Sequence, residues 1–420
     1  MRYLIVNASQ LLMMNGPDRA RHGPEMSSIG LVRDGAVLVE EGKILAAGLP
    51  DLVAAHELAA KARILDAGGR VILPGFVDSH THPVFAGPRL KDFESRLKGR
   101  SYADIAAEGG GILSTVNGVR RASLNSLTES LRHRAGRFLE CGTTTIEAKS
   151  GYGLELDSEL KMLRAIRSVD EAGPLEIIAT FLGAHALPVE MRHDREGYLK
   201  RLCEEMLPAV AKEKLARFAD VFCEKGFFTV AEAQRIFAAA AQAGLLPKIH
   251  AEQLTRSASL TMALQAGAVS ADHLDCVDDS DLALLAKTGT VAALVPGSNY
   301  FLNKPYPPAR RLIDAGAAVA LATDFNPGSC PCWDMRMIMS IACTQMKMTP
   351  EEALVAATIN GAAALGLVKS HGSLEPGKIA DLVCYEAEDY RELPYYFGAP
   401  QVAWTMKRGV IVHSRHEYRL

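Results

Sequence analysis

Short hydrophobic runs alternate with longer amphipathic stretches over most of the chain, from residue 71 onward. The first run, residues 71–77, is apolar throughout, as a parallel strand buried on both faces would be. Ala- and Leu-rich stretches with helical spacing separate most of the runs. The expected strands are residues 71–77, 143–148, 176–182, 220–223, 247–250, 268–271, 291–295 and 318–322, and clear helical patterns occupy 126–140, 158–172, 230–243 and 279–288.

Eight strand and helix units in succession predict an α/β fold, a (β/α)8 TIM-like barrel over residues 71–367. A doubly wound open sheet is the alternative, but no Gly-X-Gly-X-X-Gly motif follows the first strand. The chain has 420 residues, enough for such a barrel and a smaller second domain.

Both ends of the chain have the pattern of short β-strands. Brief apolar or alternating runs at residues 3–7, 36–40, 43–47 and 62–66 are broken by turn pairs such as Asp34-Gly35. After the barrel, residues 382–385, 402–408 and 409–412 show the same pattern. We therefore expect a small β-sandwich domain built from residues 1–70 and 368–420, in which the two termini pair.

The composition excludes several classes of protein. Hydrophobic residues make up 48% and charged residues 23%, as in ordinary globular proteins. The net charge of −3 gives no reason to expect nucleic acid or a membrane as a partner, and no apolar run reaches membrane-spanning length. Residues 1–10 lack the features of a secretory signal, and the eight cysteines show no framework spacing, so we expect reduced thiols and a cytoplasmic location.

The first hydrophobic run leads into His80-Thr81-His82. If the strand continues to this point, the two imidazoles project the same way, because side chains two residues apart share a face. Two converging imidazoles can hold a transition metal such as zinc. A His-X-His sequence in a surface loop is the alternative, so the rest of the chain must decide.

Polar residues also follow the C-terminal ends of the other expected strands. In a barrel of this kind the C-terminal strand ends meet at one face, where catalytic residues gather. Five of the twelve histidines lie there with an aspartate, which core packing does not explain. The segments are 80–82 after strand one, 147–152 after strand two, 183–185 after strand three, 250–253 after strand five, 272–273 after strand six and 323–329 after strand eight.

We expect His80, His82, His250 and Asp324 to bind one divalent metal ion. Three neutral imidazoles and one carboxylate leave a place for a water molecule. The ion would lower the pKa of that water, so that hydroxide becomes available as a nucleophile, and Asp324 could also take its proton. The pattern therefore predicts metal-assisted hydrolysis.

His273 and Glu252 are candidates for the remaining catalytic roles. His273 either polarises a substrate carbonyl or hydrogen-bonds to the attacking water, and the alternative is a brace for a metal ligand. Glu252 follows His250 and could carry a proton to a leaving nitrogen. Its neighbour Gln253 can only form hydrogen bonds.

Other side chains near these strand ends are candidates for substrate binding. Arg89 could bind a carboxylate through two parallel hydrogen bonds, although a surface arginine is the alternative. Tyr152 lies between two glycines and so on a loop, and His185 either donates to a substrate oxygen or is structural. A carboxylated Lys149 or Lys225 would bridge a second metal, but neither is convincing, and we expect one metal.

These residues resemble the amidohydrolase superfamily, whose hallmark is His-X-His on strand one, His on strands five and six, and Asp on strand eight. The segment Gly-Ser-Leu-Glu-Pro-Gly-Lys-Ile-Ala-Asp-Leu-Val at 372–383 is similar to its return into the β-sandwich. Within the superfamily, the chain resembles the imidazolonepropionase family. The motifs that carry this resemblance are Asp-Ser-His-Thr-His-Pro-Val-Phe-Ala-Gly at 78–87, Lys-Ser-Gly-Tyr-Gly-Leu-Glu-Leu at 149–156, Asp-Val-Phe-Cys-Glu-Lys-Gly at 220–226, Lys-Ile-His-Ala-Glu-Gln at 248–253, Pro-Gly-Ser-Asn-Tyr-Phe-Leu at 296–302 and Thr-Asp-Phe-Asn-Pro-Gly-Ser at 323–329.

The resemblance implies hydrolysis of the cyclic amide C–N bond of 4-imidazolone-5-propanoate to N-formimidoyl-L-glutamate, in histidine degradation. It implies one zinc or iron ion and a homodimer. An arginine suits the propanoate group, and flanking donors suit a planar cyclic amide. The residues that the resemblance implies in substrate binding are Arg89, Tyr152, His185, Gln253, Asn326, Gly328 and Ser329.

One position departs from the pattern of related deaminases. These enzymes, and some members of the family, have a glutamate three residues after the strand-five histidine, where this chain has Gln253 and its carboxylate at Glu252. Asp324 with His273 could handle the proton instead. Two rival functions stay open: a deaminase of another heterocycle, and a non-catalytic scaffold protein with the same fold, although such scaffolds usually lose the metal histidines that this chain keeps.

Overall fold

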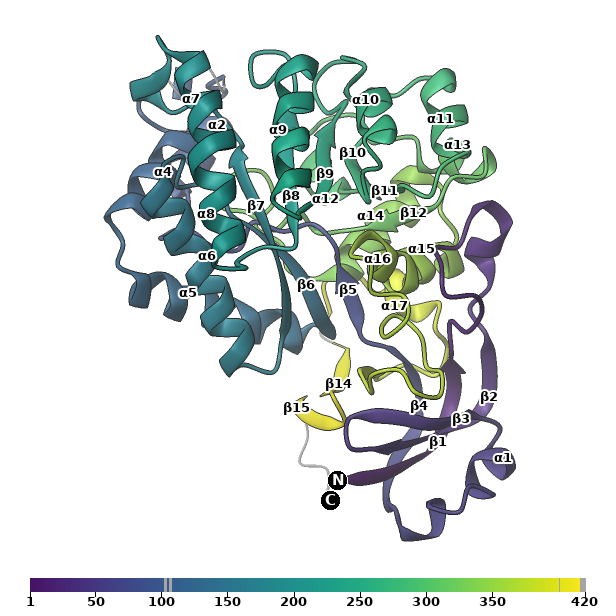
Figure 1. Ribbon diagram of the computed structural model, residues 1–420. Coiled ribbons are helices and arrows are strands. Elements are labelled where there is room, and N and C mark those ends of the chain that lie inside the picture. Colours follow the sequence, from purple (N-terminus) through teal and green to yellow (C-terminus); the bar gives the residue numbers. More distant parts are fainter. Residues whose placement is uncertain (102–103, 106–107, 400, 416–420) are drawn as a thin grey trace.

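A computed structural model describes residues 1–101, 104–105, 108–399 and 401–415 of the chain, and two sheets dominate it (Figure 1). The larger sheet is surrounded by helices, and the smaller lies to one side and contains strands from both ends of the chain (Figure 1). No helix in the described ranges is long and apolar enough to cross a membrane.

The larger sheet has eight parallel strands within the described residues, in the order β12-β11-β10-β9-β8-β7-β6-β5. The segments that follow the first and last strands meet where Thr81 and Phe325 form a parallel bridge, so the sheet closes on itself. Seven of the eight predicted barrel strands lie at or near their predicted positions, and the first differs. Their bounds are β5 Phe76–Asp78, β6 Thr143–Lys149, β7 Glu176–Ala184, β8 Phe218–Cys223, β9 Leu246–Ala251, β10 Ser270–His273, β11 Val291–Leu294 and β12 Val319–Leu321.

Helices follow the strands and cover the outside of the barrel (Figure 1). The four predicted helical patterns correspond to α5, α6, α9 and α11. The helices of the barrel are α2 Leu90–Leu97, α4 Ile112–Arg121, α5 Leu124–Glu140, α6 Leu156–Ala172, α7 Arg195–Arg201, α8 Leu207–Lys212, α9 Val230–Gln242, α10 Ser259–Gln265, α11 Asp279–Leu285, α12 Pro296–Leu302, α13 Ala309–Asp314, α14 Met335–Met346, α15 Pro350–Ala357 and α16 Ile359–Ala364.

The smaller sheet joins the two ends of the chain. Its order over the described part of the chain is β15-β14-β13-β4-β1-β2-β3. β13 pairs antiparallel with β4, so a C-terminal strand lies directly beside an N-terminal one. The bounds are β1 Arg2–Leu12, β2 Leu31–Glu40, β3 Lys43–Gly48, β4 Arg63–Pro74, β13 Leu382–Tyr385, β14 Val402–Lys407 and β15 Val410–Ser414, with the short helices α1 Pro50–Ala54 and α17 Glu392–Tyr395.

The predicted fold class, a barrel with an additional β-domain, is confirmed. We propose that residues 1–70 with 368–420, and residues 71–367, fold as the two domains, although β4 of the smaller sheet continues to Pro74. Residues 102–103, 106–107, 400 and 416–420 of that division lie outside the described residues.

The predicted first strand, residues 71–77, is in fact two strands in different sheets. Gly75 separates β4 from β5: its N–H donates to the Asp381 carbonyl of the smaller sheet at 3.0 Å, whereas the N–H of Phe76 donates to Gly142 beside the barrel at 3.0 Å. A Cβ atom on Gly75 would lie 2.3 Å from the Thr144 side chain. The continuous apolar pattern hides the break, because both strands are buried.

Replacing Gly75 by alanine should destabilise the protein. The added methyl group overlaps the Thr144 side chain, and overpacking of this kind costs about 1–3 kcal/mol. Urea unfolding followed by circular dichroism measures the loss. The matched control is Gly136→Ala in α5, where a Cβ meets nothing within 4 Å and stability should rise by about 0.5–1 kcal/mol. Equal stability of the Gly75 variant and the parent would contradict this account.

Candidate metal centre and active site

Three imidazole nitrogens and one carboxylate oxygen converge at the C-terminal end of the barrel. Nε2 of His82 lies 3.2 Å from Nε2 of His80 and 3.4 Å from Nε2 of His250. Oδ1 of Asp324 lies 3.6 Å from Nε2 of both His80 and His82. All four side chains are buried. The structure therefore brings together the four residues predicted as metal ligands.

The spacing and chemistry of these atoms fit one divalent ion. Metal–nitrogen bonds of about 2.0–2.1 Å in a tetrahedral site put the ligand atoms about 3.3–3.4 Å apart. Burial holds the pKa of His80 and of His82 well below the usual value, so both imidazoles are neutral donors. Burial also raises the pKa of the Asp324 carboxyl to about 8, and a cation beside it would favour the ionised form.

The sequence pattern predicted that the strand continues to His80 and His82, but both residues lie beyond its end. β5 ends at Asp78, and His80 and His82 follow it in an extended segment. The His82 N–H donates to the Phe325 carbonyl at 2.8 Å, and the Asp324 N–H donates to the His80 carbonyl at 3.0 Å. These bonds hold the segment against the chain after β12, so both rings still point to one place.

Carboxylates lie behind two of the imidazoles. Oδ2 of Asp272 lies 2.6 Å from Nδ1 of His80, and Oδ2 of Asp220 lies 3.0 Å from Nδ1 of His250. Nδ1 of His82 is buried and has no hydrogen-bond partner among the described residues, and the Asp220 contact of His250 Nδ1 is close but lacks hydrogen-bond geometry. A carboxylate at Nδ1 keeps the proton there, so the Nε2 lone pair faces the cluster.

The loop after β12 orients Asp324. Oδ1 of Asn326 accepts hydrogen bonds from the N–H groups of Gly328 and Ser329, each at 2.8 Å. Its Nδ2 donates to the Asp324 carbonyl and to Ser329 Oγ, each at 2.7 Å, and Ser329 Oγ lies 3.4 Å from Asp324 Oδ2. Asn326 therefore shapes this loop, and Ser329 is the member of it that faces the Asp324 carboxylate.

Glu252 lies next to the site but its carboxylate points to the start of α10. It accepts hydrogen bonds from the Ser257 N–H at 2.6 Å, from Ser259 Oγ at 3.1 Å and from the Leu260 N–H at 3.2 Å. With these partners it is a helix-capping residue, and the geometry does not favour it as a proton carrier. Gln253 is half-buried beside it, and no contact of its side chain with the cluster is seen among the described residues.

His273 completes a ring of imidazoles around the cluster. Its ring centroid lies 5.3 Å from that of His80 and 5.2 Å from that of His250. Nδ1 of His273 is buried without a hydrogen-bond partner among the described residues, and burial holds its pKa well below the usual value. The side chain is therefore a neutral imidazole with an unused nitrogen.

Tyr152 and His185 lie at the edge of the cluster. The rings of His82 and His185 stack with centroids 5.3 Å apart, and the Tyr152 ring lies 5.4 Å from that of His185. Nδ1 of His185 lies 3.0 Å from the Gly151 carbonyl, so this nitrogen carries the proton. Burial lowers the pKa of His185 to about 3, so its Nε2 is an acceptor, and the part of His185 in substrate binding stays a prediction.

A buried carboxylate holds the loop that carries Tyr152. Glu159, in α6, accepts from the N–H groups of Gly151 at 3.0 Å, Gly153 at 2.7 Å and Leu154 at 2.9 Å. The sequence offered no clear signal for this role, because a glutamate in the first turn of a helix is common.

Arg89 is half-buried near the loop after β12, with 15% of its side chain exposed. Nε of Arg89 has no hydrogen-bond partner in the described part of the chain, and Oδ2 of Asp92 lies 3.6 Å from it. The guanidinium lies directly over Gly328, where a Cβ atom would be 1.1 Å from one of its nitrogens. Gly328 thus provides the space that Arg89 occupies.

The two lysines considered as metal bridges differ in position. Lys225 is exposed. Lys149 is fully buried below the cluster, and its ammonium contacts Asp220 at 2.7 Å and Glu147 at 2.9 Å. Asp220 and Glu147 were not predicted as functional residues. A signal was available in the sequence, because charged side chains in otherwise apolar strands are unusual.

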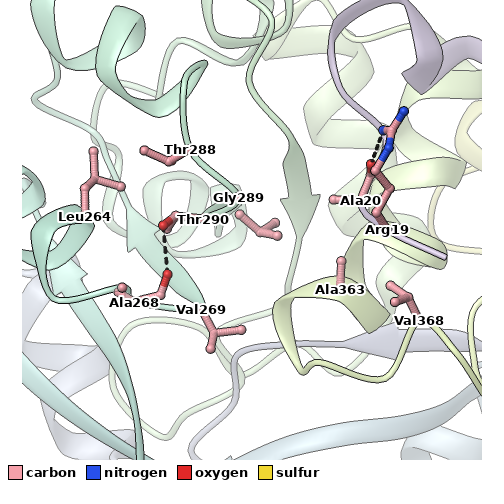
Figure 2. A pocket seen from close by; sticks show the side chains of 12 residues that line it. Arg19, Ala20, Leu264, Ala268, Val269, Thr288, Gly289, Thr290, Ala363 and Val368 are labelled. Atoms are coloured by element: carbon pink, nitrogen blue, oxygen red, sulfur yellow. Dashed lines mark hydrogen bonds between the residues drawn. The ribbon is translucent and has the colours of Figure 1, made fainter. Parts of the chain in front are cut away.

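A separate apolar groove lies at the other end of the barrel strands (Figure 2). Ala268 precedes β10 and Thr290 precedes β11, and the Thr290 hydroxyl donates to the Ala268 carbonyl at 2.8 Å. Arg19, on the far side of the groove, donates to the Ala20 carbonyl at 2.9 Å. None of its described lining residues is a histidine, cysteine or carboxylate, so the metal-type cluster stays the candidate site.

Comparisons with known proteins agree with this geometry. The sequence model of the amidohydrolase family matches residues 71–412. The chain belongs to the amidohydrolase family. Amidohydrolases similar to it over nearly the full length include a protein named imidazolonepropionase from Symbiobacterium thermophilum, 47% identical over 99% of this chain and 98% of that one. A protein of the same name from Solibacter usitatus is 46% identical over 98% of both chains.

Among solved structures, E. coli guanine deaminase is similar to this amidohydrolase, with a TM-score of 0.73 over 99% of this chain and 100% of that chain. The two sequences are 17% identical, so this likeness concerns the fold alone.

Replacing His80 by alanine should abolish tight metal binding by this amidohydrolase. The variant removes one of four converging donors, and a site with three ligands holds its ion much less firmly. Elemental analysis after gel filtration should find about one equivalent of metal in the parent and almost none in the variant. His133→Ala, on the exposed face of α5, should retain the parental content. A His80 variant with full metal content would refute this ligand assignment.

Proposed function

We propose that the chain is a metal-dependent imidazolonepropionase. It hydrolyses the cyclic amide C–N bond of 4-imidazolone-5-propanoate and yields N-formimidoyl-L-glutamate, a step of histidine degradation. The observation that carries the proposal is the identity of 46–47% to two proteins of that name over at least 98% of each chain. The half-buried Arg89 beside the loop that follows β12 supports it, because the substrate carries a carboxylate.

His80, His82, His250 and Asp324 would hold one divalent ion, zinc or iron. The distances between the ligand atoms, and the neutral imidazoles of His80 and His82, support this ligand set. When bound, such an ion supplies Lewis acidity and makes a neighbouring water more acidic. The carboxylates behind His80 and His250 keep the ring protons at Nδ1, away from the ion.

Asp324 and His273 would handle the proton of the attacking water. As the water oxygen bonds to the ring carbonyl carbon, a carboxylate oxygen of Asp324 takes its proton and gives it to the ring nitrogen when the C–N bond breaks. His273, neutral and with Nδ1 free among the described residues, lies beside His80 and His250 and can orient the substrate carbonyl or the water. Glu252 has no part in this step, since its carboxylate caps α10.

Arg89 would bind the propanoate group, and Tyr152 and His185 would bind the ring. A guanidinium matches a carboxylate with two parallel hydrogen bonds, and the unused Nε–H of Arg89 supports this role. Nε2 of His185 accepts a hydrogen bond, which suits a ring N–H of the substrate. Ser329 and Gly328 would line the same side of the pocket.

The proposal also covers the location, the oligomeric state and the partners of the protein. We propose that it acts as a cytoplasmic homodimer on a small-molecule substrate, without nucleic acid or a membrane as partner. All eight cysteines are unpaired, and the net charge is −3, which supports a reducing compartment and no polyanionic partner. Sedimentation at micromolar concentration tests the dimer.

A deaminase of another heterocycle is the second candidate, because guanine deaminase shares the fold. Incubation of the purified protein with 4-imidazolone-5-propanoate separates the two. We expect the ultraviolet absorbance of the substrate to disappear without release of ammonia. Ammonia release, or turnover of a purine with no loss of the imidazolone, would favour the deaminase and refute the proposal.

Replacing Arg89 by alanine should raise KM about 10- to 100-fold, since a hydrogen bond to a charged group contributes about 1.5–3 kcal/mol. The value of kcat should change much less, because carboxylate binding is shared by the ground state and the transition state. Gly328→Ala should raise KM in the same direction with the arginine still present, because its Cβ occupies the place of the guanidinium. Steady-state kinetics measure both variants.

The control for this pair is Arg132→Ala, at an exposed position of α5. Its KM should equal that of the parent. An unchanged KM in the Arg89 variant would exclude Arg89 from substrate binding.

A further inference from the structure

Five charged residues form a cluster inside the barrel, directly below the candidate metal ligands. The interior charge cluster consists of Glu147 and Lys149 on β6, Asp220 on β8, Lys248 on β9 and Asp272 on β10. Every one of these side chains has no exposed surface. The proposed hydrolytic reaction uses none of them directly.

Lys149 lies at the centre of this cluster. Its Nζ is 2.7 Å from Asp220 Oδ2, 2.9 Å from Glu147 Oε2 and 3.5 Å from Asp272 Oδ2. Lys248 has different partners: its Nζ contacts Glu147 Oε2 at 2.9 Å and the Ser79 carbonyl at 2.9 Å. Lys149 is therefore the ammonium that joins the two aspartates.

The same two aspartates contact the metal-type cluster from behind. Asp272 Oδ2, which faces Lys149, also lies 2.6 Å from Nδ1 of His80. Asp220 Oδ2, bonded to Lys149, also lies 3.0 Å from Nδ1 of His250. Each aspartate thus lies between the Lys149 ammonium and one imidazole. The Lys149 ammonium is therefore linked to His80 through Asp272 and to His250 through Asp220.

Loss of the ammonium would leave three buried carboxylates with one lysine. Lys248 contacts Glu147 at 2.9 Å, whereas Lys149 contacts Asp220 at 2.7 Å and Asp272 at 3.5 Å. Without the Lys149 ammonium, both aspartates would lose this cation in a part of the barrel where no side chain of the cluster is exposed. Each carboxylate could then turn away from the imidazole in front of it, which would remove the support at Nδ1 of His80 and of His250.

We propose that Lys149 is a positioning residue for the metal centre, which holds the carboxylates of Asp220 and Asp272 where they fix the tautomers and orientations of His80 and His250. This inference rests on the metal site of the proposed function. It also gives Lys149 a role other than that of a carboxylated bridge: its ammonium fills the space between carboxylates in which a second cation would lie.

The test is zinc binding by the full-length Lys149→Met variant. Apoprotein is titrated with zinc in competition with a chromogenic chelator, and the visible spectrum of the cobalt-loaded protein is recorded. We expect the dissociation constant for zinc to rise about 10- to 100-fold, the usual effect of removing such a support. The cobalt spectrum should change as well, since the orientation of His80 and His250 changes.

Lys407→Met is the matched control. Lys407 is equally buried and also lies between two carboxylates, with Nζ 3.0 Å from Glu176 Oε2 and 2.6 Å from Asp381 Oδ2. It belongs to β14 of the smaller sheet and contacts no candidate metal ligand among the described residues. This variant should lower the unfolding temperature but leave the zinc affinity within about threefold of the parent, well below the change expected for loss of a metal-supporting residue.

The double variant Lys149→Met/Glu147→Gln keeps the test decisive if the single variant does not fold. It removes one ammonium and one carboxylate, so the interior keeps its original net charge. If Lys149 only balances charge, the double variant should bind zinc as the parent does. If Lys149 positions Asp220 and Asp272, zinc affinity stays at least about 10-fold weaker in the folded double variant.

The outcomes separate this inference from the proposed function. A parent protein that binds no zinc or iron overturns the proposed metal site itself. A parent that binds one ion, together with a Lys149 variant of equal affinity and identical cobalt spectrum, overturns the inference alone. Weaker binding in both Lys149 variants, with parental binding in the Lys407 control, supports it.

Discussion

Buried carboxylates need positive partners, and the inside of this barrel is built around that requirement. An unpaired charge away from water costs several kcal/mol, so each ionised group must have a partner of opposite charge or a set of donors. Lys149 and Lys248 meet this need for Glu147, Asp220 and Asp272. Because the aspartates also face imidazoles, the charge balance of the interior and the geometry of the metal-type cluster depend on each other.

Strand register places these groups in layers. On β9, Lys248 and His250 are two residues apart and share the inner face, as Glu147 and Lys149 do on β6. Asp272 is the register partner of His250 on the neighbouring strand. A shift of one residue in any of these strands would turn the charged side chains outward and apolar ones inward. The large cost of that change specifies the register, and with it the position of the ligands.

Much of this arrangement could be predicted from the sequence, for identifiable reasons. The barrel follows from repeated apolar runs, and the convergence of His80, His250 and Asp324 follows from the rule that parallel strand ends meet at one face. The break at Gly75 could not be found, because β4 and β5 are both buried and give one continuous apolar run. The orientation of Glu252 could not be predicted either, since its place after His250 does not show that its carboxylate turns to the α10 backbone.

The cluster accounts for metal chemistry but not for the choice of substrate, which depends on the loops. A deaminase 17% identical to this chain shares the fold, so the barrel alone does not distinguish the two reactions. In the proposed function, substrate binding would depend on local features: the space over Gly328 that admits the Arg89 guanidinium, and the Gly151 carbonyl that makes His185 an acceptor. Each depends on a single backbone position at a strand end. Specificity in this fold can therefore change through a few glycines and loop contacts while the charged interior and the ligands stay in place.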